Sequence, residues 1–364
     1  MRILIFDIAR GLGIIFVAIF HLVYRTENGI ADRLVMESIW LIIPFFFIVS
    51  GYFVKVNDGH MLQNVAHKLK NLLLPTILCS AIMLVLLGIY CAIFHGYDFR
   101  AWSFDVIATY LRPEFFGKIP FFASYDLINA LVFDLVSPVW FVWTMAFTIP
   151  VFYACVRFVN LQKFWQVAII CAILLLFSFG LYDYRNDFSW SLIIVPVYAA
   201  IMIFARYLRE AGLASKFLDY KNAYIFAVFA FAIHRSMFEF CGSSSIFMNE
   251  LGTLGKFSVF TFFVQAFVGS YAFLIFCEAL CFVKYLRVYL AFVGRNSLYF
   301  LLMHRFFAAI FADLMGTYIK SGANWYVKFS GEVFVKSFVT FVLSMICCSF
   351  VARFYERKCL ANCL

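Results

Sequence analysis

The chain has 364 residues, of which 65% are hydrophobic and only 13% are charged, and its mean hydropathy is +0.93. Soluble domains average about 45–50% apolar and about 25% charged residues, so this composition excludes a soluble globular enzyme. The formal net charge of +9 does not indicate nucleic-acid binding, because no basic stripe accompanies a recognition fold and membrane proteins collect Lys and Arg in their cytoplasmic loops. The sequence therefore predicts a protein of the lipid bilayer with no nucleic-acid partner.

Apolar runs of about twenty residues, rather than alternating strands of about ten, predict an all-α polytopic membrane protein. The expected membrane-spanning helices, about ten in number, cover residues 8–24, 38–56, 72–94, 138–158, 165–181, 189–206, 222–238, 257–283, 289–311 and 331–352. An even number of spans places both termini on the same side. Lys and Arg are denser in the segments on the side of the N-terminus, so the positive-inside rule predicts that both termini are cytoplasmic.

The first predicted helix carries polar residues that membrane spans rarely contain, in the run FDIARGLGIIFVAIFH over residues 6–21. Arg10 and His21 are eleven residues apart, which places them within about 20° of one helix face and about 16 Å apart along the axis. Asp7 precedes Arg10 by three residues and can pair with it. A neutral imidazole can act as a general base toward a hydroxyl, and arginine binds phosphate. The alternative is structural: Arg10 reaches the inner headgroups and His21 bonds another helix.

The second predicted helix ends in the run WLIIPFFFIVSGYFVK over residues 40–55, with Ser50 and Tyr52 near its cytoplasmic end. A serine in a span more often bonds its own backbone than a ligand. Lys68 and Lys70 precede the apolar part of the third helix. They are either ordinary positive-inside charges or part of a site for the phosphates of a donor.

The longest stretch without a predicted span covers residues 95–137 and is rich in aromatic side chains. It predicts an extracytoplasmic or interfacial cap over the bundle, and an aromatic anchor at the membrane interface is the alternative. Trp140 follows this stretch, in SPVWFVWTM over residues 137–145. It is either a residue of the aromatic belt or part of a pocket.

Late in the chain, the run GRNSLYFLLMHRFF over residues 294–307 contains Asn296, Ser297 and His304. Ser297 and His304 are seven residues apart, about 20° from a common helix face. A packed, hydrogen-bonded histidine is the alternative to a pocket residue. The 11 cysteines have no zinc-type or CxxC spacing, so they are expected to be small buried hydrophobes, and we predict no metal site.

Taken together, four of these runs resemble the integral-membrane acyltransferase-3 family, especially its fucose O-acetylase-like members and polysaccharide O-acetyltransferases. FDIARGLGIIFVAIFH is similar to the opening block of the family, in which ten residues separate an Arg from a His. The others resemble its later blocks in the same order: PFFFIVSGYFVK, PVWFVWTM and GRNSLYFLLMH. Some branches carry an Arg-x-x-Arg pair before the third helix, where this chain has His67 and Lys70.

The resemblance implies a membrane O-acyltransferase that moves an acetyl or other short acyl group from cytoplasmic acyl-CoA to a hydroxyl of a sugar. That sugar belongs to a surface polysaccharide or its lipid-linked precursor. Acetyl-CoA is then a co-substrate, and no cofactor is bound permanently. The resemblance implies that His21 and Arg10 are catalytic and that Arg10, Lys68 and Lys70 bind the donor. The predicted substrate pocket contains Asp7, Ser50, Tyr52, Trp140, Asn296, Ser297 and His304.

We expect residues 1–364 to form a single membrane-embedded domain without a soluble domain, located in a bacterial inner membrane. The expected partners are the bilayer, acyl-CoA and a glycan acceptor, and a homo-oligomer or an envelope-synthesis partner stays open. A second function class is a transporter or flippase of an envelope glycan or lipid precursor, which would use the same polar residues as a path. Its usual inverted repeats with paired broken helices are not found in the sequence. A non-catalytic assembly partner is the third alternative.

Overall fold

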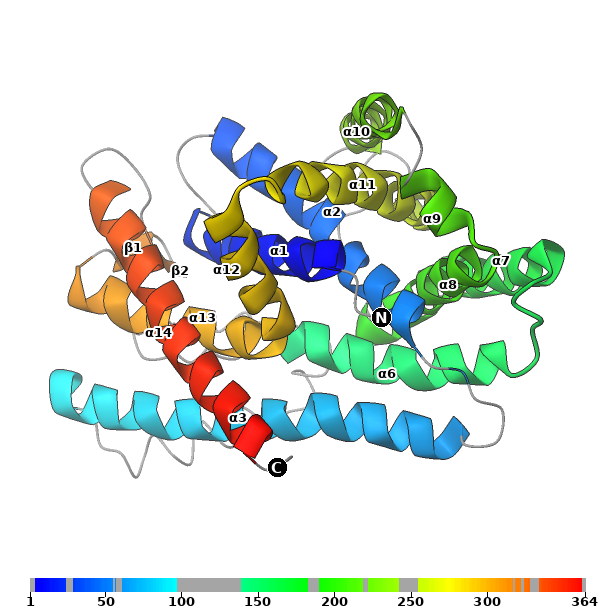
Figure 1. Ribbon diagram of the computed structural model, residues 1–364. Helices are drawn as coiled ribbons and strands as arrows, with labels where there is room; N and C mark the ends of the chain where they lie inside the picture. Colours follow the sequence, from blue (N-terminus) through cyan, green and yellow to red (C-terminus); the bar gives the residue numbers. More distant parts are fainter. Residues whose placement is uncertain are drawn as a thin grey trace.

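The computed structural model describes residues 4–23, 29–54, 56, 61–96, 139–182, 190–218, 222–241, 255–316, 318–321, 324–327 and 334–361. In this part of the chain the structure is almost wholly helical (Figure 1). The helices are α1 (Leu4–Val23), α2 (Gly29–Phe53), α3 (Met61–His95), α6 (Val139–Val156), α7 (Phe164–Leu181), α8 (Trp190–Glu210), α9 (Leu213–Leu218), α10 (Ala223–Cys241), α11 (Ser258–Leu280), α12 (Lys284–Arg295), α13 (Ser297–Leu314) and α14 (Phe334–Ala361). A 3-10 turn over Gly255–Phe257 precedes α11, and β1 (Tyr318–Ser321) and β2 (Asn324–Val327) form a short antiparallel hairpin. The predicted cap over residues 95–137 lies almost entirely outside the described residues.

Five described segments are long and apolar enough to cross a membrane: α3, α7, α11, α13 and Val335–Glu356 of α14. Leu41–Phe53 in α2 and Trp140–Val156 in α6 are shorter apolar segments. Large apolar side chains are exposed on the peripheral helices, for example Phe177 on α7 and Phe229 on α10. Hydrocarbon, unlike water, accommodates such surfaces without cost. The prediction of a helical membrane protein is confirmed.

The predicted span over residues 289–311 is wrong as a single helix, because α12 ends at Arg295 and α13 begins at Ser297. Asn296 lies between them with φ −103° and ψ 20°. Its backbone N–H and its Nδ2 both donate to the carbonyl of Phe292, at 3.2 and 3.0 Å. An asparagine side chain that bonds the preceding turn in this way competes with the continuation of a helix. As a result α12 runs across α1 instead of along it (Figure 1).

The centre of the bundle is α1, which packs against α2, α11, α12 and α13. Glycine makes its closest contact possible: a Cβ atom on Gly11 would lie 2.0 Å from the carbonyl oxygen of Leu290 in α12. A Cβ on Gly294 would lie 1.8 Å from the carbonyl oxygen of Asp7. Gly51 has the same role between α2 and α8, where its Cβ would lie 2.3 Å from the oxygen of Met202. Three of the four sequence blocks thus contain a glycine at which two helix backbones touch.

Candidate functional site

The polar face of α1 begins with Asp7 and Arg10. Asp7 is buried, and its Oδ1 lies 4.0 Å from Nη1 of Arg10, whose side chain is 25% exposed. The predicted pairing of these residues one turn apart is therefore present. Because Gly11 and Gly294 bring α12 against this turn, the position of the pair is fixed by backbone packing. The guanidinium still reaches the surface of the bundle.

A second cation, on another helix, lies within electrostatic range of Arg10. Lys68 of α3 is half-buried and close enough to Arg10 for the two charges to interact. Like charges that interact in this way repel each other, and an anionic group such as a phosphate near both of them relieves that repulsion. Lys70 is exposed and, two residues further along the helix, lies about 200° around the axis from Lys68. The structure thus places Lys68 within electrostatic range of Arg10 and leaves Lys70 on another face.

Next to this pair lies the end of α2, which carries the second of the four family-like runs, PFFFIVSGYFVK. The ring of Tyr52 in α2 stacks on Phe6 of α1, with centroids 5.2 Å apart and an interplanar angle of 28°. Phe53 packs edge-on against Phe6 at 5.1 Å. Ser50, one turn earlier in the helix, is half-buried. The cytoplasmic end predicted for α2 is thereby joined to the turn of α1 that carries Asp7.

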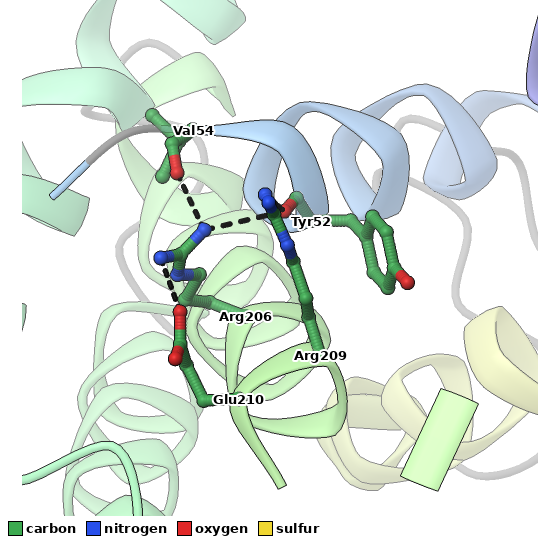
Figure 2. A network of polar contacts seen from close by, with 5 residues as sticks. All are labelled: Tyr52, Val54, Arg206, Arg209 and Glu210. Carbon is green, nitrogen blue, oxygen red and sulfur yellow. Dashed lines mark hydrogen bonds and ion pairs between the residues drawn. The ribbon is translucent and has the colours of Figure 1, made fainter. Parts of the chain in front are cut away.

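Two arginines of α8 bind the end of α2 (Figure 2). Nη1 of Arg206 donates to the carbonyl oxygens of Val54 at 2.7 Å and Tyr52 at 3.4 Å, and Arg206 also forms an ion pair with Glu210. Nη1 of Arg209 donates to the carbonyl of Tyr52 at 2.8 Å, and its guanidinium lies 5.5 Å from the centre of the Tyr52 ring. The last carbonyls of a helix have no donors within it and carry partial negative charge. The arginines supply both the donors and the opposite charge.

Sequence reasoning missed this contact. In the sequence, Arg206 and Arg209 are only two of the many basic residues on the side of the N-terminus, and nothing in the spacing links α8 to the end of α2. The one available signal is that the two arginines are three residues apart, which places them about 60° apart on the helix. That spacing predicts a shared surface but not its partner.

The third run, PVWFVWTM at the start of α6, packs against α2 through aromatic side chains. Trp140 is half-buried at the start of α6, and its ring lies 6.1 Å from that of Phe141. Phe141 in turn packs against Phe46 and Phe47 of α2, at 5.7 and 5.3 Å. Trp140 therefore lies beside the Phe-rich run of the second block, and its role in a substrate pocket stays a prediction.

The fourth block joins α1 directly, because Gly294 touches the backbone at Asp7. Asn296 is buried and its side chain bonds Phe292 within its own segment. Ser297 is half-buried at the start of α13. His304 is buried at 2% exposure, with Nδ1 2.9 Å from the carbonyl oxygen of Phe300. The structure places these residues on the helices that flank α1, and their part in a pocket stays a prediction.

The second and fourth blocks therefore adjoin the first on α1, although 238 residues separate them, and the third block packs against the second. His21 lies on α1, eleven residues beyond Arg10, and its side chain is outside the described residues. Over the described ranges, no group of three His, Cys, Asp or Glu side chains could hold a metal ion. The described part of the chain therefore has two interacting cations near one end of α1, and His21 follows further along the same helix.

Comparison with known proteins adds one match. A family model described as "Acyltransferase domain", that of the acyltransferase-3 family, matches residues 3–353. No curated protein and no solved structure matches the chain.

Proposed function

The chain belongs to the acyltransferase-3 family, and we propose that this membrane acyltransferase moves an acetyl group from acetyl-CoA to a sugar hydroxyl. The sugar would belong to a surface polysaccharide or to its lipid-linked precursor. The observation that carries the proposal is the electrostatic interaction of Lys68 in α3 with Arg10 in α1, the helix that also carries His21. A polyanionic donor suits the two cations, and an acceptor hydroxyl suits the imidazole.

The proposal includes an orientation. About ten spans with both termini in the cytoplasm place the Arg10–Lys68 end on the side where acetyl-CoA is available, and the membrane is then a bacterial inner membrane. Arg206 of α8, which binds the end of α2, lies on this same side. The high density of Lys and Arg on that side supports the orientation.

The chemistry follows from the order of groups along α1. The phosphates of acetyl-CoA bind near Arg10 and Lys68, and the pantetheine arm extends toward His21, about 16 Å further along the axis. The imidazole of His21 accepts the proton of the acceptor hydroxyl, while the oxygen of that hydroxyl forms a bond to the thioester carbonyl carbon. The carbon–sulfur bond breaks, and the departing CoA thiolate takes up the proton that His21 holds. The products are the acetyl ester and CoA.

Arg206 and Arg209 act on this site through the end of α2. They bind the carbonyls of Tyr52 and Val54, and Tyr52 stacks on Phe6, one residue before Asp7. They are therefore positioning residues, which hold the wall beside Arg10 in place.

The experiment is complementation of a deletion strain with the wild type, His21→Ala, or His60→Ala as a control histidine that the sequence places in a loop. Ester-linked acetate on cell-surface glycans is released with mild base and measured by mass spectrometry, and membrane insertion of each variant is verified. We expect the wild type and His60→Ala to restore acetate. His21→Ala should lower transfer about 10²- to 10⁴-fold, the contribution of a general base.

If His21→Ala restores acetate as well as the wild type does, His21 is not the base. If even the wild type leaves glycan acetylation unchanged, the acetylation proposal fails. Radiolabelled acetyl-CoA consumption by the purified protein then distinguishes another acceptor from a transport function, which would consume no acyl-CoA.

A further inference from the structure

A second polar cluster joins the ends of two helices away from Arg10. The hydroxyl of Tyr90 in α3 donates to Oδ2 of Asp313 in α13 at 2.6 Å. Nε2 of His95, at the end of α3, lies 2.7 Å from the same oxygen. Sequence reasoning placed His95 at the start of a long loop, and 218 residues separate it from Asp313.

This cluster lies at the opposite end of the bundle from the two cations. Along α3, Tyr90 is 22 residues beyond Lys68, which is about 33 Å of helix. Along α13, Asp313 is 16 residues beyond Ser297, or about 24 Å, and Ser297 follows the segment that touches Asp7. In Figure 1, α3 ends on the left of the view, on the side toward which α13 also runs.

The protein uses only part of the hydrogen-bonding capacity of this cluster. Within the described part of the chain, both bonds to Asp313 end on Oδ2, and His95 is engaged through Nε2 alone. When Nε2 carries the imidazole proton, Nδ1 is an acceptor, and Oδ1 of the carboxylate is another. The side chains of His95 and Asp313 are 28% and 13% exposed, so a ligand at the surface can reach both.

An apolar ring completes the cluster. Phe94 is 60% exposed and packs beside Tyr90, with ring centroids 4.8 Å apart. Two hydrogen-bond acceptors next to an exposed aromatic face match a neutral sugar, whose hydroxyls donate protons and whose C–H face packs on a ring. An anionic ligand is disfavoured here, because the Asp313 carboxylate repels it.

We propose that Phe94, His95 and Asp313 form a binding subsite for the sugar acceptor, on the end of the bundle opposite the donor phosphates. This inference rests on the proposed function, because it supplies the acceptor for the same transfer reaction. Asp313 and His95 accept hydrogen bonds from sugar hydroxyls, and Phe94 packs against the pyranose face. Tyr90 does not touch the sugar and only holds the carboxylate.

The test uses the purified full chain in lipid nanodiscs with radiolabelled acetyl-CoA and, as acceptor probes, the methyl glycosides of short oligosaccharides of fucose, rhamnose, galactose and glucose. An oligosaccharide is required because the subsite lies about 17 Å of helix rise beyond the level of His21. Asp313→Asn and His95→Ala should each raise the KM for the best glycoside about tenfold, the usual effect of losing one hydrogen bond to a charged or strongly polar group. The KM for acetyl-CoA should stay within a factor of two. Phe94→Leu should raise the glycoside KM less.

Tyr90→Phe is the matched control, because it removes a hydrogen bond to Asp313 but no group that faces the ligand. If it raises the glycoside KM as much as Asp313→Asn does, the cluster only ties α3 to α13 and the proposal is overturned. Equal changes in the KM for acetyl-CoA and for the glycoside overturn it as well.

Direct binding separates this inference from the proposed function. Saturation-transfer NMR detects binding of the methyl glycosides without any acyl donor, with the wild type and Asp313→Asn compared side by side. If no acetyl transfer occurs but glycoside binding is present and weakened by Asp313→Asn, the subsite stands and the proposed reaction fails. Glycoside binding that is absent or unaffected by the substitution overturns the subsite even where acetyl-CoA is consumed.

Discussion

The two ends of the bundle are built in different ways. At the end that holds Arg10 and Lys68, helices meet backbone to backbone, at Gly11 and Gly294 between α1 and α12 and at Gly51 between α2 and α8. At the other end, α3 and α13 are tied through side chains that converge on the single carboxylate of Asp313. The first end has main-chain contacts, to which the arginine cap of α2 adds side-chain bonds. The other end is tied by hydrogen bonds that side-chain rotation can break.

The difference matches the ligands that we propose for each end. Cations held next to each other repel, so an end that collects Arg10 and Lys68 requires a rigid frame to keep them in place. A neutral sugar requires acceptors and an apolar ring, and such groups can lie on a more adaptable surface. The following substitutions test whether the two ends of the bundle differ in rigidity as their contacts indicate.

The largest effect is expected for Gly294→Ala at the crossing of α1 and α12. The new Cβ would lie 1.8 Å from the backbone oxygen of Asp7, and no side-chain rotation can relieve a clash with the main chain. We expect a loss of about 3 kcal/mol in the free energy of unfolding, the upper part of the usual range for overpacking. Tryptophan fluorescence during SDS titration in mixed micelles measures it.

The control for that substitution is Gly180→Ala in α7, where a Cβ would meet no atom within 4 Å. An alanine in a helix is more favourable than a glycine by about 0.5–1 kcal/mol, so this variant should be at least as stable as the wild type. Equal destabilisation by the two substitutions would show that the crossing at Gly294 has no special rigidity.

The arginine cap of α2 should give the next largest effect. Arg206→Gln removes the donor to the Val54 carbonyl and the partner of Glu210, so we expect a loss of about 2 kcal/mol, as for other hydrogen bonds from charged groups. Arg235→Gln is matched to it, since Arg235 pairs with Glu239 at the same four-residue spacing on α10. That surface pair should contribute less than about 1 kcal/mol. Thermal unfolding in detergent compares the two, and similar losses would mean that the cap contributes nothing beyond the ion pair.

The extent to which these features follow from the sequence depends on how local their causes are. The helices and the pairing of Asp7 with Arg10 are predictable, because apolar run length and a three-residue spacing on a helix determine them. The break at Asn296 was missed, although the polar run over residues 294–297 interrupts the apolar pattern there, because the side-chain bond to Phe292 that accompanies it is not encoded in hydropathy. The contacts of Arg206 with α2 and of His95 with Asp313 join residues more than 150 positions apart. No periodicity encodes such tertiary contacts.

A smaller effect is expected from the second cation at the donor end. Lys68→Gln keeps the length of the side chain approximately and removes its charge beside Arg10. The KM for acetyl-CoA should rise about tenfold, because one charge-assisted contact to phosphate is lost. Lys70→Gln should raise it about twofold, since Lys70 is exposed and solvent and salt screen its charge. The steady-state rate of acetyl-CoA consumption at several ionic strengths measures both. A larger effect at Lys70 would contradict the placement of the donor phosphates.

The smallest effect is expected at the opposite end. Tyr90→Phe removes one of the two hydrogen bonds to Asp313 and keeps the aromatic packing against Phe94. Because His95 still binds the carboxylate, we expect a loss of about 1 kcal/mol, a third of that for Gly294→Ala. Tyr289→Phe is the control: among the described residues its hydroxyl contacts Ser349 at an exposed 3.4 Å, so the substitution should change the thermal unfolding midpoint very little. A loss at Tyr90 as large as that at Gly294 would show that side chains fix this end as firmly as main-chain contacts fix the other, and the contrast between the two ends would fail.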